Sequence, residues 1–83
     1  MKTFYVLVGV AYKTRSDFEK GNPYRTRFYE LIIIADCEES ANRKAKDIAI
    51  KELRKEEPYN ATIEAFIERS NPVFDYCIIT DGD

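Results

Sequence analysis

The segment Phe28-Tyr29-Glu30-Leu31-Ile32-Ile33-Ile34-Ala35 runs directly into Asp36-Cys37-Glu38-Glu39, and this join decides the fold. The first eight residues are rich in apolar and β-branched side chains, which favours a strand. Asp36 is a good helix N-cap residue, and Glu39 stands at the capping-box spacing from it. The join therefore predicts that a strand over Arg25–Ala35 leads straight into a helix.

The predicted helix is amphipathic and ends before Pro58, because proline disfavours helical backbone in the residue before it. Polar residues occupy most of its surface. Its apolar stripe consists of Ala41, Ala45, Ile48, Ala49 and Leu53. Since most of this stripe is alanine, the helix is expected to lie close against a sheet.

Strand patterns stand on both sides of this unit. Thr3–Lys13 is apolar on both faces, which is typical of a central strand, and a long hairpin connection over Tyr12–Arg27 follows it. Ala61–Arg69 alternates as a third strand, Ser70-Asn71-Pro72 predicts a turn, and Val73–Thr80 predicts a last strand. The third strand is expected to point Ile63, Ala65 and Ile67 inward and Thr62, Glu64, Phe66 and Glu68 outward.

These elements predict a single α+β domain over residues 1–83. Its order is ββαββ, with one mainly antiparallel four-stranded sheet in the order 2-1-3-4 and a single helix packed on one face. This order puts the doubly apolar first strand in the centre. Because one helix covers one face only, the opposite face, including Phe66, is expected to stay partly bare and to bind a partner or form a homodimer.

Charge is uneven along the chain, although 13 basic and 15 acidic residues leave a net charge of only −2. Residues 1–30 hold six bases against three acids, and residues 58–83 hold one base against five acids. No apolar run approaches the ~20 residues of a membrane span, and the first residues lack a signal-peptide pattern. Two cysteines are too few for a disulfide framework, so we expect a cytoplasmic protein.

The sequence lacks histidine and glycine-rich motifs, on which many catalytic and phosphate-binding sites depend. The chain has no histidine, which removes the commonest general base and metal ligand, and its three glycines leave no phosphate-binding loop. We therefore expect no enzymatic activity, no cofactor and no metal site, with Asp75, Asp81 and Asp83 as solvated acids. Cys37 is expected to be a small buried or half-buried residue and Cys77 a core residue, and their pairing is left open.

The hairpin segment Tyr12–Arg27 interleaves basic and aromatic residues. Cations hold phosphate while rings stack on bases, so this pattern suits nucleic acid. Tyrosine and arginine also dominate protein hot spots, and a merely solvated hairpin with its rings on the sheet fits the same residues. The predicted partner-binding residues are Tyr12, Lys13, Arg15, Lys20, Tyr24, Arg25 and Arg27 on the hairpin and Phe66 on the sheet.

The segment Ile33-Ile34-Ala35-Asp36-Cys37-Glu38-Glu39-Ser40-Ala41-Asn42-Arg43-Lys44-Ala45 resembles the strand-to-helix join of very small bacteriophage and mobile-element proteins. Among these it is similar to the anti-CRISPR inhibitors built from a sheet and one helix, which are single domains without catalytic machinery. The resemblance implies a phage-encoded inhibitor in the host cytoplasm that occupies a nucleic-acid-binding surface of a host defence complex.

The leading hypothesis is therefore a non-enzymatic binding protein, of the inhibitor type, whose partner is a host protein or ribonucleoprotein complex. One alternative is a small DNA- or RNA-binding module that uses the hairpin. Another is a homodimeric structural or assembly protein that uses the bare sheet face. A further alternative is that the acidic C-terminal third mimics nucleic acid toward a basic host site.

Overall fold

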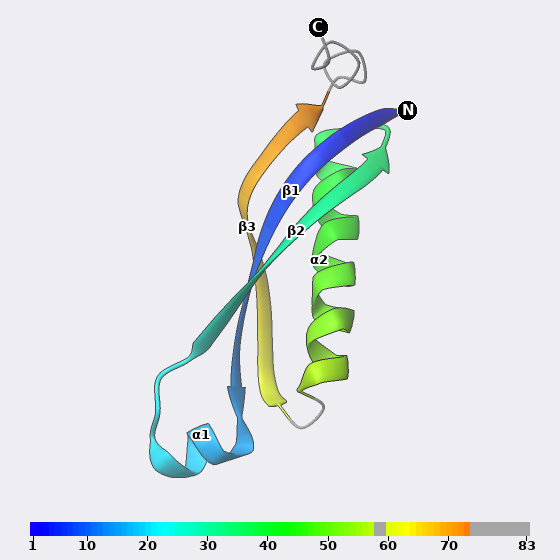
Figure 1. Cartoon of the computed structure of the whole chain (residues 1–83). Coiled ribbons are helices and arrows are strands. Elements are labelled where there is room, and N and C mark those ends of the chain that lie inside the picture. The colour runs from blue at the N-terminus through cyan, green and yellow to red at the C-terminus, as the bar shows by residue number, and fades with distance from the viewer. Residues whose placement is uncertain (58–59, 74–83) are drawn as a thin grey trace, which may run out of the picture.

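The computed structural model describes residues 1–57 and 60–73, which form a twisted antiparallel sheet with one long helix on one face (Figure 1). The elements in chain order are β1 (Lys2–Thr14), α1 (Arg15–Lys20), β2 (Arg25–Ala35), α2 (Glu38–Glu56) and β3 (Asn60–Val73). β1 lies between β2 and β3 and pairs antiparallel with both. The predicted α+β class, the central first strand and the single covering helix are confirmed.

The described sheet has three strands in the order β2-β1-β3, so the predicted four-stranded sheet is wrong for this part of the chain. The predicted turn at Ser70-Asn71-Pro72 is also wrong, because these residues continue β3 and pair with β1. Pro72 is tolerated there because β3 forms an edge of the described sheet, where a missing N–H breaks no second ladder. Residues 74–80 of the predicted last strand lie outside the described residues.

The core lies between α2 and the facing side of the sheet. The alanines of the helix stripe and Leu53 are fully buried, and even-numbered residues from Phe4 to Tyr12 of β1 pack under them. Ile63, Ala65 and Ile67 of β3 pack against this cluster, so their predicted inward orientation is confirmed. Ile48, predicted in the stripe, is instead 38% exposed, because it lies on the flank of the helix and not on the line of the buried alanines.

The helix start differs from the prediction. α2 begins at Glu38, and its N-cap is Cys37, whose side chain makes no capping hydrogen bond. Asp36 is therefore not the cap, because the chain needs Asp36 and Cys37 to turn from the end of β2 into the helix. Cys37 is a free, exposed thiol and not the buried or half-buried residue predicted. Cys77, and so any pairing with it, lies outside the described residues.

Candidate partner-binding surface

The sheet face opposite α2 carries large apolar side chains in solvent. The register places odd-numbered residues of β1 beside even-numbered residues of β2, for example Gly9 beside Phe28 and Tyr5 beside Ile32. The large exposed apolar side chains here are Phe28 (53%), Ile32 (64%), Ile34 (59%) and Phe66 (37%). We call this surface the open face; it comprises Tyr5, Leu7, Gly9, Ala11, Phe28, Glu30, Ile32, Ile34, Glu64, Phe66, Arg69 and Asn71.

Two aromatic rings cover the centre of the open face. The Phe66 ring lies directly on Gly9, so that a Cβ added to this glycine would be 2.2 Å from Phe66 Cζ. Phe28 meets Phe66 edge to face, with ring centroids 6.2 Å apart and an interplanar angle of 89°. Edge-to-face geometry is a favourable arrangement for an aromatic pair. The two rings therefore form a defined apolar block over the central strand.

A row of opposite charges crosses the open face beside this block. Leu7 of β1 pairs with Glu30 of β2 on one side and with Arg69 of β3 on the other. The Tyr5 hydroxyl donates a hydrogen bond to Glu30 Oε2 at 2.8 Å. This hydrogen bond is the main cause that raises the pKa of Tyr5 above 10.0, with burial second. Within the described residues no ion pair joins Glu30 to Arg69.

The connection between β1 and β2 contains a short helix where the sequence predicted only a hairpin connection. α1 begins with a capping box, in which the Asp17 N–H donates to Thr14 Oγ1 (3.1 Å) and the Thr14 N–H donates to Asp17 Oδ2 (3.0 Å). Gly21 ends the helix with φ 68°, a left-handed conformation that favours glycine. The sequence analysis missed this capping box, although Thr14 and Asp17 stand at the same spacing as Asp36 and Glu39, where the predicted cap does not form.

Asp17 is a buried carboxylate that organises this connection. Its side chain is 1% exposed, and Arg25 donates to it from two guanidinium nitrogens, at 2.9 Å and 3.0 Å. The Asn22 amide donates a further hydrogen bond at 3.2 Å. The hydrogen bond from the Thr14 backbone, followed by the one from Arg25, holds the pKa of the Asp17 carboxyl well below its usual range.

The structure brings the predicted hairpin residues together but gives most of them partners inside the chain. Arg25 is held by Asp17, and Arg27 forms an ion pair with Glu56 of α2. Lys13 Nζ lies 5.0 Å from the Phe18 ring centre and 4.9 Å from that of Tyr24. Among the remaining predicted residues, Tyr12 is a core residue, Arg15 is exposed beside Glu19, and Lys20 and Tyr24 are exposed.

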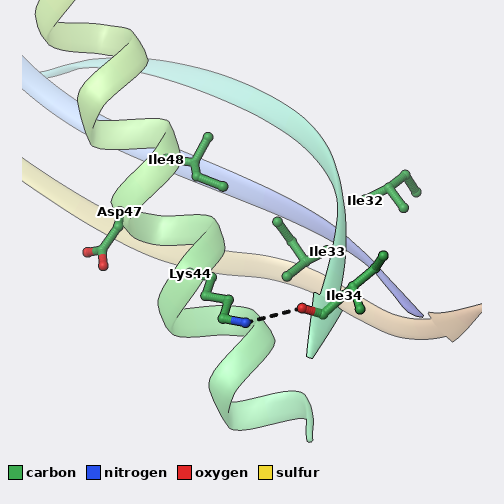
Figure 2. A pocket seen from close by; sticks show the side chains of 6 residues that line it. All are labelled: Ile32, Ile33, Ile34, Lys44, Asp47 and Ile48. Carbon is green, nitrogen blue, oxygen red and sulfur yellow. Dashed lines mark hydrogen bonds between the residues drawn. The ribbon is translucent and has the colours of Figure 1, made fainter. Parts of the chain in front are cut away.

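An open groove of about 430 Å³ lies between α2 and the outer edge of β2. Figure 2 shows Ile33 pointing toward α2 and Ile32 on the other side of the strand. Lys44 Nζ donates to the Ile34 carbonyl at 3.2 Å and so occupies one backbone acceptor of this edge. The groove is lined by Ile32, Ile33, Ile34, Lys44, Asp47 and Ile48, a mainly apolar set without a catalytic arrangement.

Glu30, Arg69 and Gly9 belong to the open face but were not among the predicted site residues. The two-residue alternation that places Phe28 and Ile32 outward also places Glu30 there, so the sequence held that signal. Among residues 1–57 and 60–73, no cluster of His, Cys, Asp or Glu could hold a metal ion. No helix in this part of the chain is long and apolar enough to cross a membrane.

Similarity to known proteins does not assign this surface. No protein-family model, curated protein or solved structure matches the chain.

Proposed function

We propose that this chain is a non-enzymatic binding protein whose partner-binding surface is the open face. The observation that carries the proposal is the group of four large apolar side chains on one face, each more than a third exposed. Contiguous apolar patches on soluble domains usually mark interaction sites. Glu30 and Arg69 lie on the two outer strands with Leu7 between them, so the charges stand at the sides of the sheet, as polar residues do at the rim of a protein interface.

The hairpin supports a second candidate, a nucleic-acid-binding module, less well than the sequence suggested. The guanidinium groups of Arg25 and Arg27 already face carboxylates, so a phosphate would have to displace an internal partner. Lys13 already makes cation–π contacts with two rings, and it would have to give up part of this attraction to bind a phosphate. The observation that favours this candidate is the exposure of the bases Arg15 and Lys20 at the end of the hairpin.

A narrower form of the proposal names the partner as a host defence complex. It is supported by the strand-to-helix resemblance described above and not by the open face itself. In this form the open face would cover the nucleic-acid-binding surface of that complex. The protein would then inhibit the complex by blocking nucleic-acid binding, and it would catalyse no reaction.

Affinity capture from bacterial lysate, with and without nuclease, tests the proposal. The test variant is Phe28→Ser on the open face, and the matched control is Phe18→Ser on α1, since these two phenylalanines are 53% and 48% exposed. We expect the wild type and the Phe18 variant to retain the same protein partner after nuclease treatment. We expect the Phe28 variant to lose it.

Two results would contradict this function. Equal capture by the Phe28 and Phe18 variants would show that the partner does not use the open face. Loss of every partner after nuclease treatment would favour the nucleic-acid module, and charge reversal at Arg15 and Lys20 should then abolish binding. Melting curves of each variant establish that both proteins are folded before capture.

A further inference from the structure

We propose that the open face of the free protein is occupied by a second copy of this chain, related to the first by a two-fold axis parallel to β1. This inference rests on the proposed function, because the second copy uses the same binding surface that another partner would displace it from. It would turn two sheets with one helix each into four layers, with the sheets packed face to face inside and the helices outside.

The charge row of the open face is self-complementary under this rotation. Glu30, Leu7 and Arg69 stand side by side on β2, β1 and β3. With strands about 4.8 Å apart, Glu30 and Arg69 are separated by roughly 10 Å of sheet within one copy. A two-fold axis parallel to β1 lays β2 of each copy over β3 of the other. Each Glu30 then faces Arg69 of the second copy, and the two leucines meet at the axis.

The row of aromatic rings agrees with the same rotation. Phe28 and Phe66 stand on either side of Gly9, so each Phe28 comes to lie over Phe66 of the second copy. A two-fold axis running across the strands through the charge row would instead set Glu30 against Glu30 and Arg69 against Arg69. Like charges facing each other in an interface are costly, so the charges select the axis parallel to the strands.

The open face is small for a dimer interface. Three strands at ~4.8 Å and five side-chain rows at ~6.7 Å cover roughly 500 Å² of each copy. About 1,000 Å² in total is the lower limit for a specific protein interface. We therefore expect a reversible dimer with a dissociation constant in the micromolar range, and not a permanent one.

Sedimentation velocity across the micromolar range tests the inference with three charge variants. Arg69→Glu and Glu30→Arg should each weaken the dimer by roughly 100-fold, because each makes two repulsive pairs and a charged pair is worth about tenfold. The double variant should recover the wild-type dissociation constant. An equimolar mixture of the two single variants should form a heterodimer, since both of its charge pairs are attractive. Arg43→Glu, an exposed reversal on α2, is the matched control and should leave the dimer unchanged.

The mixture of the two single variants also distinguishes a lost charge pair from a lost fold, because an unfolded variant would not form a heterodimer on mixing. A wild-type monomer throughout the micromolar range would overturn the inference, while capture of a different protein lost in the Phe28 variant would still support the proposed function. A dimer that ignores the charge reversals would overturn the two-fold arrangement. A dimer that also ignores Phe28→Ser would use another surface, and would leave the lysate experiment to decide the proposed function.

Discussion

Replacing Gly9 with alanine tests whether the Phe66 ring dictates a glycine at the centre of the sheet. The new Cβ would lie 2.2 Å from Phe66 Cζ and 2.6 and 2.8 Å from the two Cε atoms. Carbon atoms in contact prefer about 3.5–4.0 Å, so the ring has to move by more than about 1 Å. That movement breaks the edge-to-face contact with Phe28 and exposes more of the ring, which is already partly in solvent.

The expected loss is about 1 kcal/mol in the free energy of unfolding. The lost ring contact contributes about 0.5–1.5 kcal/mol, and ~40 Å² of re-exposed apolar surface adds about 1 kcal/mol. Alanine in place of glycine within a strand stabilises the fold by about 0.5–1 kcal/mol, which offsets part of this loss. Gly9 does not adopt a positive φ, so backbone strain adds nothing to this difference.

Urea unfolding of a double-mutant cycle measures the effect. Gly9→Ala is made in the wild type and in Phe66→Ala, at a protein concentration low enough that self-association contributes nothing. In the Phe66→Ala background the clash is absent, so the alanine should become neutral or stabilise by up to about 1 kcal/mol. An equal destabilisation in both backgrounds would refute the steric argument.

Three further predictions follow from the same structure. Asp17→Asn should lower Tm by roughly 5–10 °C at neutral pH. Because folding lowers the pKa of Asp17, the ionised carboxylate stabilises the wild type fully above the unfolded carboxyl pKa near 4, and this stabilisation is lost as the pH falls below it. Tm of the variant should therefore depend less on pH between about 5 and 3 than Tm of the wild type. Thermal melts over this range check the sign, and parallel wild-type and variant curves would contradict it. Ala45→Leu should cost about 1–3 kcal/mol by overpacking the helix against the sheet, whereas Arg43→Leu on the exposed side should change the free energy of unfolding by less than about 0.5 kcal/mol. Glu30→Gln should lower the pKa of Tyr5 toward 10, seen as one phenol that ionises earlier in an alkaline absorbance titration and that is absent in a Tyr5→Phe background.

The central position of β1 was predictable because its residues are apolar on both faces. The structure explains this pattern by two different surroundings, the core under α2 on one face and the middle of the open face on the other. The same periodicity placed Ile63, Ala65 and Ile67 against the core. Local alternation therefore assigned the layers correctly, because burial of one face is what creates the alternation.

The path of β3 beyond Ile67 was not predictable, because it depends on the partner strand. Leu7 pairs with Arg69 while Val8 pairs with Ile67, so Glu68 forms a bulge that reverses the alternation. Simple alternation from Ile67 would have turned Arg69 toward the core. The bulge turns it to the open face, which is why the face on which Arg69 lies, unlike that of Glu30, did not follow from the alternation.

The internal partners of the hairpin arginines were not predictable for a related reason. A sequence shows the bases near one another but does not show which carboxylates fold against them. Arg27 meets Glu56 from the far end of α2, and Arg25 meets an aspartate buried by the short helix α1. Surface charge on this connection is therefore lower than its composition indicates.

The strand order β2-β1-β3 also sets when the fold can be completed during synthesis. β1 and β2 are close in the chain, but β3 starts at Asn60, after the whole of α2. Pairings between distant segments form slowly, because closing the long loop between them costs entropy before any contact stabilises it. Until the ribosome has delivered β3, one edge of β1 has no neighbour, and an unpaired edge can pair with another nascent chain. We therefore expect β1 strands of neighbouring nascent chains to mispair most often on polysomes, where several copies are synthesised close together.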